Sequence, residues 1–588
     1  MANYIATDTE LTSVANAIRS KAGTSTALSF PTEFVSAIND IPTGGGAADE
    51  KTVIFYDYDG SVIASYTPAE FADLSALPVN PTHSGLTSQG WNWTLADAKT
   101  HVASYGRLNI GQMYITDDGK TRIHIKLEEG RLTPYLAIAP NGTCDIDWGD
   151  GSAHDTVTGG TSIIGQSIPH TYITPGEYTI VLDVVDGYVG FPMSIMQGSQ
   201  NGEITAYQNS VHSVEVGSGI PTLGRYMFGE FHALSFITVP NSVTGIDDNA
   251  FYNCYSLHYV TIPIGVTRIP DRAFYNCYSL SSVSVPKGIT GFGDSVFYSC
   301  YALRSTTLPG SVTSLGNSVF YNCYSLSSVV IPDSVLSFGG SVFYGCSALS
   351  SITIPDGVTK ISSNMFYSCT ALSNVVIPNS VTSIESSAFT NCYSLPSVTI
   401  PNGVTGIAST AFSGCRAMTS VTIPSGVTSI SQSMFSNCNN LVSVIIPNGV
   451  TSIGKNAFAN CSSLYSVTIP NSVTSFDTGA FSSCYSLSSI TIPSGVTSIS
   501  ASNFSTCKSL SSIIIPSGVT SIGKSAFSSC SSLGFIKFEP TTPPAAADST
   551  VFNGLRSDCI IYVPSGYLSA YQTATNYPNP NTFTYVEY

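Results

Sequence analysis

The sequence has few charged residues and lacks the features that define several protein classes. Only 10% of its 588 residues are charged, and −15 of the net charge of −16 falls within residues 1–240. Because it has no basic stripe to follow a phosphate backbone, we expect no nucleic-acid partner. No run of 18 apolar residues is present, so we expect no membrane insertion.

Signatures of catalysis are also missing. The sequence has neither the G-x-S-x-G pattern of a hydrolase nucleophile nor the H-E-x-x-H pattern of a zinc protease. The regularly spaced cysteines described below have no recurring histidine partner that could activate them. We therefore expect a protein that is not an enzyme and uses no cofactor.

A 23-residue repeat fills more than half of the chain. Thirteen cysteines follow one another at this spacing from Cys254 to Cys530 without insertion or deletion. Fourteen phenylalanines (Phe228 to Phe527) and thirteen prolines (Pro240 to Pro516) keep the same phase. A fixed period of this length is typical of a solenoid, in which each coil buries its apolar residues against its neighbours.

One repeat shows how a coil is built. Phe458, Cys461 and Leu464 step by three, which predicts a tight helical turn with one buried side. Val467 and Ile469 alternate with polar residues, which predicts a short strand that the following proline ends. We expect one strand per coil in a parallel sheet, with the apolar turn forming the opposite wall.

The repeat resembles a known family. The pattern A-F-x-x-C-x-S-L-x-S-V-x-I-P-x-x-V-x-x-I is similar to the BspA-like leucine-rich repeat of bacterial and protozoan surface proteins. The segment that contains Cys559-Ile-Ile-Tyr-Val-Pro resembles the cap that closes such arrays. Such a cap is needed because the last coil would otherwise expose its apolar edge.

The cysteines of the array are expected to fill the core. Stacked residues have parallel Cβ vectors, which disfavours disulfides, and single thiols lack the Cys-x-x-Cys spacing of a zinc site. Cysteine is small, apolar and commonly buried. We therefore predict free, unreactive thiols.

Three shorter segments precede the array. Residues 8–43 predict two helices joined by a loop. The stretch 8–41 resembles a leader on tail-associated proteins of phages of Gram-positive gut bacteria, although a small oligomerisation or packing element would give the same pattern. Residues 51–135 predict a small α+β unit with hairpins at Tyr58-Asp59-Gly60 and Asp117-Asp118-Gly119. Thr94 is expected to cap a helix that ends near Tyr105.

Residues 139–187 resemble the polycystic-kidney-disease (PKD) domain, an immunoglobulin-like β-sandwich. The resemblance is carried by Trp148-Gly-Asp-Gly, His170-Thr-Tyr and Pro175-Gly-Glu-Tyr-Thr-Ile, and it implies a spacer or binding module. Asp145, Asp147 and Asp150 are weak candidates for a bound cation. We assign no metal site and no catalytic role to them.

Taken together, these segments predict a multidomain, mainly β protein. We expect a helical attachment segment with a glycine linker at 1–46, a small α+β domain at 47–138 and a PKD-like sandwich at 139–205. The leucine-rich-repeat solenoid follows at 206–540, and the C-terminal cap at 541–588.

Tyrosines are the candidate ligand-binding residues. They follow the buried phenylalanine or the cysteine in the first coils and give way to small residues further on. The candidates are Tyr252, Tyr255, Tyr275, Tyr278, Tyr298, Tyr301, Tyr321, Tyr324, Tyr344 and Tyr367. A purely structural ring would be needed in every coil, so their restricted distribution favours a binding surface of flat rings. Recent duplication of coils with filler packing is the alternative.

These features favour a non-enzymatic protein that binds a glycan or protein of a host cell surface. The N-terminus has no secretory signal, which favours release by lysis, as in a phage virion of which this would be a tail or fibre protein. Residues 1–46 would then contact other virion proteins, and the chain could form homo-oligomers. The alternatives are a BspA-like bacterial surface adhesin and the carbohydrate-binding array of an enzyme.

Overall fold

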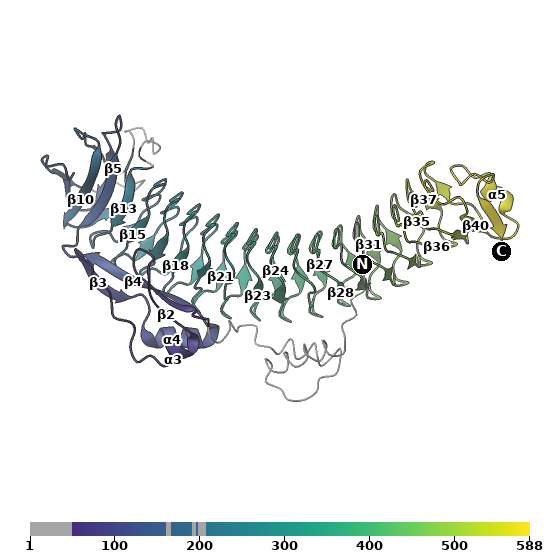
Figure 1. The fold of residues 1–588 in the computed structure, drawn as a ribbon, viewed down its shortest axis with the longest axis horizontal. Coiled ribbons are helices and arrows are strands. Elements are labelled where there is room, and N and C mark those ends of the chain that lie inside the picture. Colours follow the sequence, from purple (N-terminus) through teal and green to yellow (C-terminus); the bar gives the residue numbers. More distant parts are fainter. Residues whose placement is uncertain (1–49, 160–165, 191–195, 198–206, 208) are drawn as a thin grey trace.

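The computed structural model describes residues 50–588 except 160–165, 191–195, 198–206 and 208. The predicted attachment segment at 1–46 lies outside the described residues. The chain forms a long arc of stacked coils, with two smaller units at the N-terminal end of the arc and a cap at the other end (Figure 1). No helix in the described part of the chain is long and apolar enough to span a membrane.

The α+β unit consists of one four-stranded sheet and two helices. The sheet has the order β2-β1-β4-β3, and β1 and β2 form the hairpin predicted at Asp59-Gly60. Its elements are β1 (Val53–Tyr56), β2 (Val62–Tyr66), α3 (Pro68–Ala72), β3 (Leu86–Trp91), α4 (Leu95–Tyr105) and β4 (Leu108–Thr116). The predicted cap of α4 is confirmed, because the Thr94 side chain accepts a hydrogen bond from the backbone N–H of Asp97.

The second predicted hairpin is wrong. The turn at Asp117-Asp118-Gly119 is present, but it joins strands of two different sheets. β4 pairs with β1 and β3, whereas β5 (Thr121–Leu127) pairs with β10 (Gly176–Asp186) and β13 (Val211–Glu215). Turn chemistry alone therefore indicated where the chain reverses, but not which strands pair.

A unit of two β-sheets follows and leads directly into the array. One sheet has the order β15-β13-β5-β10-β7-β8; in the other, β6 pairs with β9, β11 and β12. The further strands are β6 (Tyr135–Pro140), β7 (Thr143–Asp147), β8 (Asp155–Thr158), β9 (Gln166–Pro169), β11 (Val189–Gly190), β12 (Met196–Gln197) and β15 (Phe236–Thr238). Trp148 and Tyr172 are buried, and the Tyr172 hydroxyl donates to the Trp148 carbonyl at 2.9 Å.

This two-sheet unit covers the open end of the solenoid. β13 pairs antiparallel with β5 on one side and parallel with β15, which belongs to the array, on the other. Apolar residues of the unit and of the first coils accordingly form one hydrophobic cluster. An end coil needs such cover because its apolar edge and its unpaired strand would otherwise face water.

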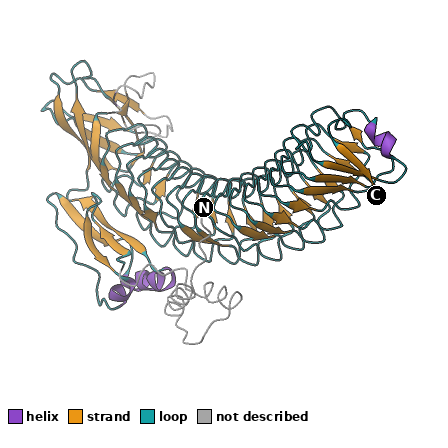
Figure 2. Cartoon of the chain, turned by 45° about the vertical axis from the view of Figure 1, so that its right-hand side comes forward, coloured by secondary structure: helices purple, strands orange, loops and turns teal. Residues whose placement is uncertain are grey.

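Most coils contribute two strands, not the single strand predicted. The longer strand precedes the proline, and we call its stack the first ladder; the strands are drawn orange in Figure 2. The first ladder after β15 comprises β17 (Tyr259–Thr261), β18 (Ser282–Ser284), β20 (Ser305–Thr306), β23 (Ser351–Thr353), β25 (Asn374–Val376), β28 (Ser420–Thr422), β30 (Ser443–Ile445), β32 (Ser466–Val467), β34 (Ser489–Ile490) and β36 (Ser512–Ile515). Paired strands are parallel, with partners 23 residues apart, as in Val283 with Val260.

The second ladder contains two-residue strands that follow the proline turn. Its strands are β14 (Thr222–Leu223), β16 (Gly245–Ile246), β19 (Gly291–Phe292), β21 (Ser314–Leu315), β22 (Ser337–Phe338), β24 (Lys360–Ile361), β26 (Ser383–Ile384), β27 (Gly406–Ile407), β29 (Ser429–Ile430), β31 (Ser452–Ile453), β33 (Ser475–Phe476), β35 (Ser498–Ile499), β37 (Ser521–Ile522) and β39 (Ala545–Ala546). Two residues are too few to show a period, so no sequence pattern predicts these strands.

The apolar turn is not helical as predicted. Asn249 and Asn253 adopt φ angles of 61° and 60°, and an equivalent left-handed pair recurs along the coils. This backbone directs N–H groups toward the next coil, where Asn249, Phe251 and Asn253 donate to carbonyls 22 residues later at 2.8–3.0 Å. A helical turn would direct the same N–H groups back along its own coil and leave the stack without these bonds.

The core role predicted for the cysteines is confirmed. All thirteen array cysteines are fully buried and unpaired. Each thiol also donates to the carbonyl of the phenylalanine one coil earlier, as Cys277 does to Phe251 at 3.2 Å. Because the backbone N–H of Cys254 bonds the same Phe251 carbonyl, the thiol satisfies the second lone pair of a buried oxygen.

The last coils continue into a cap. β38 (Phe535–Phe538), β40 (Ile560–Val563) and β41 (Thr584–Glu587) extend the first ladder beyond β36 as a parallel sheet. The short helix α5 (Leu568–Gln572) places Tyr571 in the core, where its hydroxyl donates to the Pro540 carbonyl at 2.7 Å.

Candidate binding surface

The tyrosines that follow the buried phenylalanines form one continuous stack. We call Tyr252, Tyr275, Tyr298, Tyr321, Tyr344 and Tyr367 the Phe-adjacent column. Successive ring centroids lie 4.3–5.1 Å apart, with planes within 13° of parallel. The ring of Tyr226 meets Tyr252 edge-on at 5.8 Å and begins the column. The 23-residue period places these rings in register because each Cα lies one strand spacing from the next.

A second stack runs beside the cysteines. The Cys-adjacent column consists of Tyr255, Tyr278, Tyr301 and Tyr324, with centroids 4.6–5.0 Å apart and planes within 12° of parallel. His232 stacks on Tyr255 at 4.1 Å and extends the column into the preceding coil. Sequence reasoning missed His232, although the same offset of 23 residues would have found it.

The two columns present ring edges, not ring faces. An interior ring has another tyrosine against each face, so an incoming sugar cannot stack on it without separating the pair. Tyr301 is 37% exposed and Tyr324 is 45% exposed, while the other column tyrosines are half-buried. The flat faces expected from the sequence are therefore covered within the columns, and the accessible chemistry is that of ring edges and hydroxyls.

The stacking also affects the tyrosine hydroxyls. Burial, followed by repulsion from neighbouring phenolates, raises the pKa of Tyr275 and of Tyr278. Burial and the charge of Tyr301 likewise raise the pKa of Tyr324. The hydroxyls therefore stay protonated near neutral pH, where each can both donate and accept a hydrogen bond.

Later coils replace the tyrosine stack with cation–ring pairs. Tyr393 and Tyr485 occupy the Cys-adjacent position without a tyrosine neighbour, and a cation from the next coil lies over each ring. The Arg416 guanidinium is 4.3 Å from the Tyr393 ring centroid, and the Lys508 ammonium is 5.2 Å from that of Tyr485. A cation attracted by the ring covers a face that a stacked tyrosine covers elsewhere.

The α+β unit covers part of the first ladder. Asn109 on β4 donates to Ser282 Oγ at 3.1 Å from its side chain and to Thr307 Oγ1 at 3.1 Å from its backbone. Trp93 Nε1 donates to the Val285 carbonyl at 3.0 Å, and Asn92 Nδ2 to Ser284 Oγ at 2.8 Å. We call this contact the seam. No sequence pattern predicts the seam, because a serine in a repeat is normally interpreted as a solvent-facing residue.

Beyond the seam, the outward-facing side chains of the first ladder are open to solvent. Thr261, Ser284 and Thr307 are at most 7% exposed beneath the α+β unit. In the same position of later coils, Val376 is 38% exposed and Ile445 is 63% exposed. The free part of this surface mixes serine and threonine hydroxyls with isolated apolar side chains.

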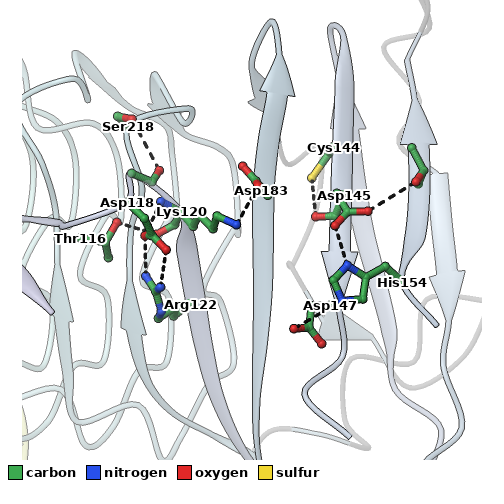
Figure 3. Close-up of polar contacts among 12 residues, drawn as sticks. Thr116, Asp118, Lys120, Arg122, Cys144, Asp145, Asp147, His154, Asp183 and Ser218 are labelled. Carbon is green, nitrogen blue, oxygen red and sulfur yellow. Dashed lines mark hydrogen bonds and ion pairs between the residues drawn. The ribbon is translucent and has the colours of Figure 1, made fainter. Parts of the chain in front are cut away.

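The three candidate aspartates form three ion pairs with two histidines. Asp145 and Asp147 share His154, with oxygen-to-nitrogen distances of 2.7 and 3.6 Å (Figure 3). Asp150 instead pairs with His170 at 2.8 Å, and the His170 ring stacks on Trp148. Burial opposes ionisation of Asp150, but hydrogen bonds from Ser152 and His170 lower its pKa to about 2. In the described part of the chain, no group of three or more His, Cys, Asp or Glu side chains is arranged to hold a metal ion.

A neighbouring polar cluster ties the two-sheet unit together. Asp118 pairs with Arg122 at 2.7 Å, and Lys120 pairs with Asp183 at 2.8 Å (Figure 3). The Arg122 hydrogen bond is the main reason that the pKa of Asp118 is lowered to about 2. Because each cation faces a carboxylate, this cluster joins strands and offers no unpaired charge to a ligand.

Comparison with known proteins agrees with the repeat architecture. The family model described as "BspA type Leucine rich repeat region (6 copies)" matches residues 203–327, 313–442 and 428–552. No curated protein matches the chain.

Among solved structures, the chain is similar to a leucine-rich repeat protein from Bacteroides ovatus, with 27% identity and a TM-score of 0.54 over 65% of this chain and 96% of that chain. It is also similar to a leucine rich cell surface protein from Faecalibacterium prausnitzii, with 32% identity and a TM-score of 0.39 over 54% of this chain and 90% of that chain. The family match spans more than half of the sequence and coincides with the stacked coils. The chain therefore belongs to the BspA-type leucine-rich repeat family.

Proposed function

We propose that the protein is a non-enzymatic adhesin of a bacterial cell surface that binds a host glycan or protein along its solenoid. Membership of the BspA-type leucine-rich repeat family supports this reading. The observation that carries it is the pair of tyrosine columns, which keep aromatic edges and hydroxyls in register over successive coils. The resemblance of residues 139–187 to a PKD domain adds a spacer or binding module to this proposal.

The columns suit binding because they are already ordered. A tyrosine on a flexible loop loses rotamer freedom when it binds, whereas a ring held between two others has lost that freedom on folding. Aromatic residues with a polar tip dominate many interfaces because they combine contact area with hydrogen bonding. With their interior faces covered, these rings would contact a ligand by hydrogen bonds from hydroxyls and by packing against ring edges.

A triple substitution tests the role of the columns. The later coils carry Ser413 and Ser436 where the Phe-adjacent column has tyrosine, so replacing Tyr275, Tyr298 and Tyr321 with serine should leave the fold intact. If the rings are anchors, each should contribute roughly 1 kcal/mol or more to binding. The measurement is adsorption of purified protein to host cells and to their isolated surface polysaccharide.

The matched control is Tyr465→Ser, which removes an isolated tyrosine that is 60% exposed in a later coil. We expect normal adsorption from this variant and strongly reduced adsorption from the triple variant. Unchanged adsorption of a stable triple variant would contradict the proposal and would redirect the search to the open surface of the first ladder.

A phage virion protein is the second candidate. It is favoured by the resemblance of residues 8–41 to a leader of phage tail-associated proteins, and those residues lie outside the described part of the chain. Mass spectrometry of purified virions from lysed cultures tests this candidate. Surface proteolysis of intact cells tests the cell-surface assignment. Recovery from virions, and loss of that recovery on removal of residues 1–43, would favour the phage assignment over the cell-surface one.

A further inference from the structure

A pocket of about 160 Å³ lies in the seam between the α+β unit and the solenoid. One wall comes from the start of the α+β unit and from the beginning of β4. The other comes from two successive coils of the first ladder. Its lining residues are Glu50, Lys51, Thr52, Ile54, Arg107, Leu108, Asn109, Arg304, Ser305, Thr306, Thr307, Ser327 and Ser328.

Two arginines line this pocket, and Glu50 is the nearby carboxylate that acts on Arg107. Among the described residues, neither Arg107 nor Arg304 forms an ion pair. Arg107 Nη1 donates to Ser328 Oγ, and Arg304 is exposed at the pocket mouth beside Lys51. Glu50 contributes one negative charge, which leaves the lining with a net positive charge in a chain whose net charge is −16.

Among the coils, Arg304 is the one lysine or arginine at its position in the repeat. The residue that follows the repeated leucine is serine in the two neighbouring coils, at Ser281 and Ser327. Other coils carry residues such as His258 and Val442 at this position, and the arginine stands at a coil that lines the pocket together with Arg107 of the α+β unit. Like charges in one pocket repel each other, and Glu50 offsets only part of the positive charge, so an anion bound there would be stabilised.

The pocket borders the hydrogen-bonded part of the seam. Asn109 lines the pocket and donates to Ser282, and Asn92 and Trp93 bond the solenoid further along.

We infer that this pocket binds one anionic sugar unit, with its carboxylate or phosphate held by Arg107 and Arg304. Guanidinium groups bind such planar or tetrahedral anions by paired, charge-assisted hydrogen bonds. The hydroxyls of Ser305, Thr307 and Ser327 offer donors and acceptors to sugar hydroxyls. The pocket volume is slightly larger than the volume that about five water molecules occupy in the liquid, which suits one sugar ring with its acid group.

Binding of free monosaccharides to the full chain tests the inference. Ligand-observed NMR titrations would use D-glucuronate, glucose 6-phosphate and D-glucose at low salt. We expect saturable binding of one or both acids, weaker binding at high salt and none of glucose. Arg304→Gln should weaken binding by roughly ten- to hundredfold, because it removes hydrogen bonds to a charged group.

One further variant and a stability measurement separate recognition from folding. Arg416→Gln removes an arginine from a distant coil and should leave binding unchanged, and thermal melts of all variants verify that they fold. Absence of saturable binding of both acids, equal binding of glucose, or unchanged binding by Arg304→Gln would each overturn the inference. The inference does not rest on the tyrosine columns, since the tyrosine triple variant should lose cell adsorption and still bind the acid sugar.

Discussion

Deleting one whole coil should be tolerated, whereas deleting half a coil should not. Removal of residues 392–414 joins Asn391 to Cys415, so each remaining residue finds its partner one coil further on. Phe389 N, for example, would donate to the Met434 carbonyl, as Phe412 N does now at 3.0 Å. The deletion should then lower the free energy of unfolding by the contribution of one coil, about 1–3 kcal/mol for 23 residues.

Removal of residues 392–402 should cost much more. This deletion takes away Leu395, Val398 and Ile400, which are 0%, 8% and 7% exposed. At roughly 1.5–3 kcal/mol for each buried side chain, their loss alone amounts to roughly 5–9 kcal/mol. The rest of the coil is also moved out of register, so polar residues would face the phenylalanine and cysteine columns of both neighbours.

Urea denaturation followed by far-UV circular dichroism measures the difference. The partial deletion should lower the apparent midpoint far more than the whole-coil deletion, or should give an insoluble protein. Removal of residues 438–460, a second whole coil, is the matched control and should resemble the first. Equal losses of stability in the whole-coil and partial deletions would refute the assumption that each coil is stabilised only by its neighbours.

Three further predictions concern the thiols and the seam. A thiol reagent at pH 7–8 should modify few of the thirteen array cysteines in the native protein and all of them after denaturation; rapid native labelling would contradict their burial. Burial raises the pKa of Cys438 and Cys530 from 9.0 to about 12, so the folded state holds these protons more tightly than the unfolded chain. Their contribution to the free energy of unfolding should be complete below pH 9 and should fall between pH 9 and 12. The decrease should be about 1.4 kcal/mol for each thiol and each pH unit. A denaturation midpoint that stays constant up to pH 10.5 would argue against this. Gly111→Ala would place a Cβ 2.3 Å from Thr261 Oγ1, so it should loosen the α+β unit and speed its proteolysis, whereas Gly406→Ala, which meets nothing within 4 Å, should not.

The repeat period by itself determined the architecture of the solenoid. Phenylalanine, cysteine and leucine recur in one phase, and a buried column is the arrangement that removes all of them from water together. The tyrosine positions were likewise fixed by the period, since residues 23 apart must lie one above the other. Their stacking distances and covered faces required the structure, because a spacing in sequence does not specify ring orientation.

The sequence could not show what depends on contacts between distant segments. The left-handed residues, the second ladder and the thiol bonds to phenylalanine carbonyls arise from the pairing of each coil with the next, where backbone groups satisfy one another across the stack. The seam joins Asn109 to Ser282, which are 173 residues apart, and neither residue has a local pattern that predicts the contact. The positively charged pocket exists only because tertiary packing brings Arg107 beside Arg304, so its chemistry could not be read from either segment alone.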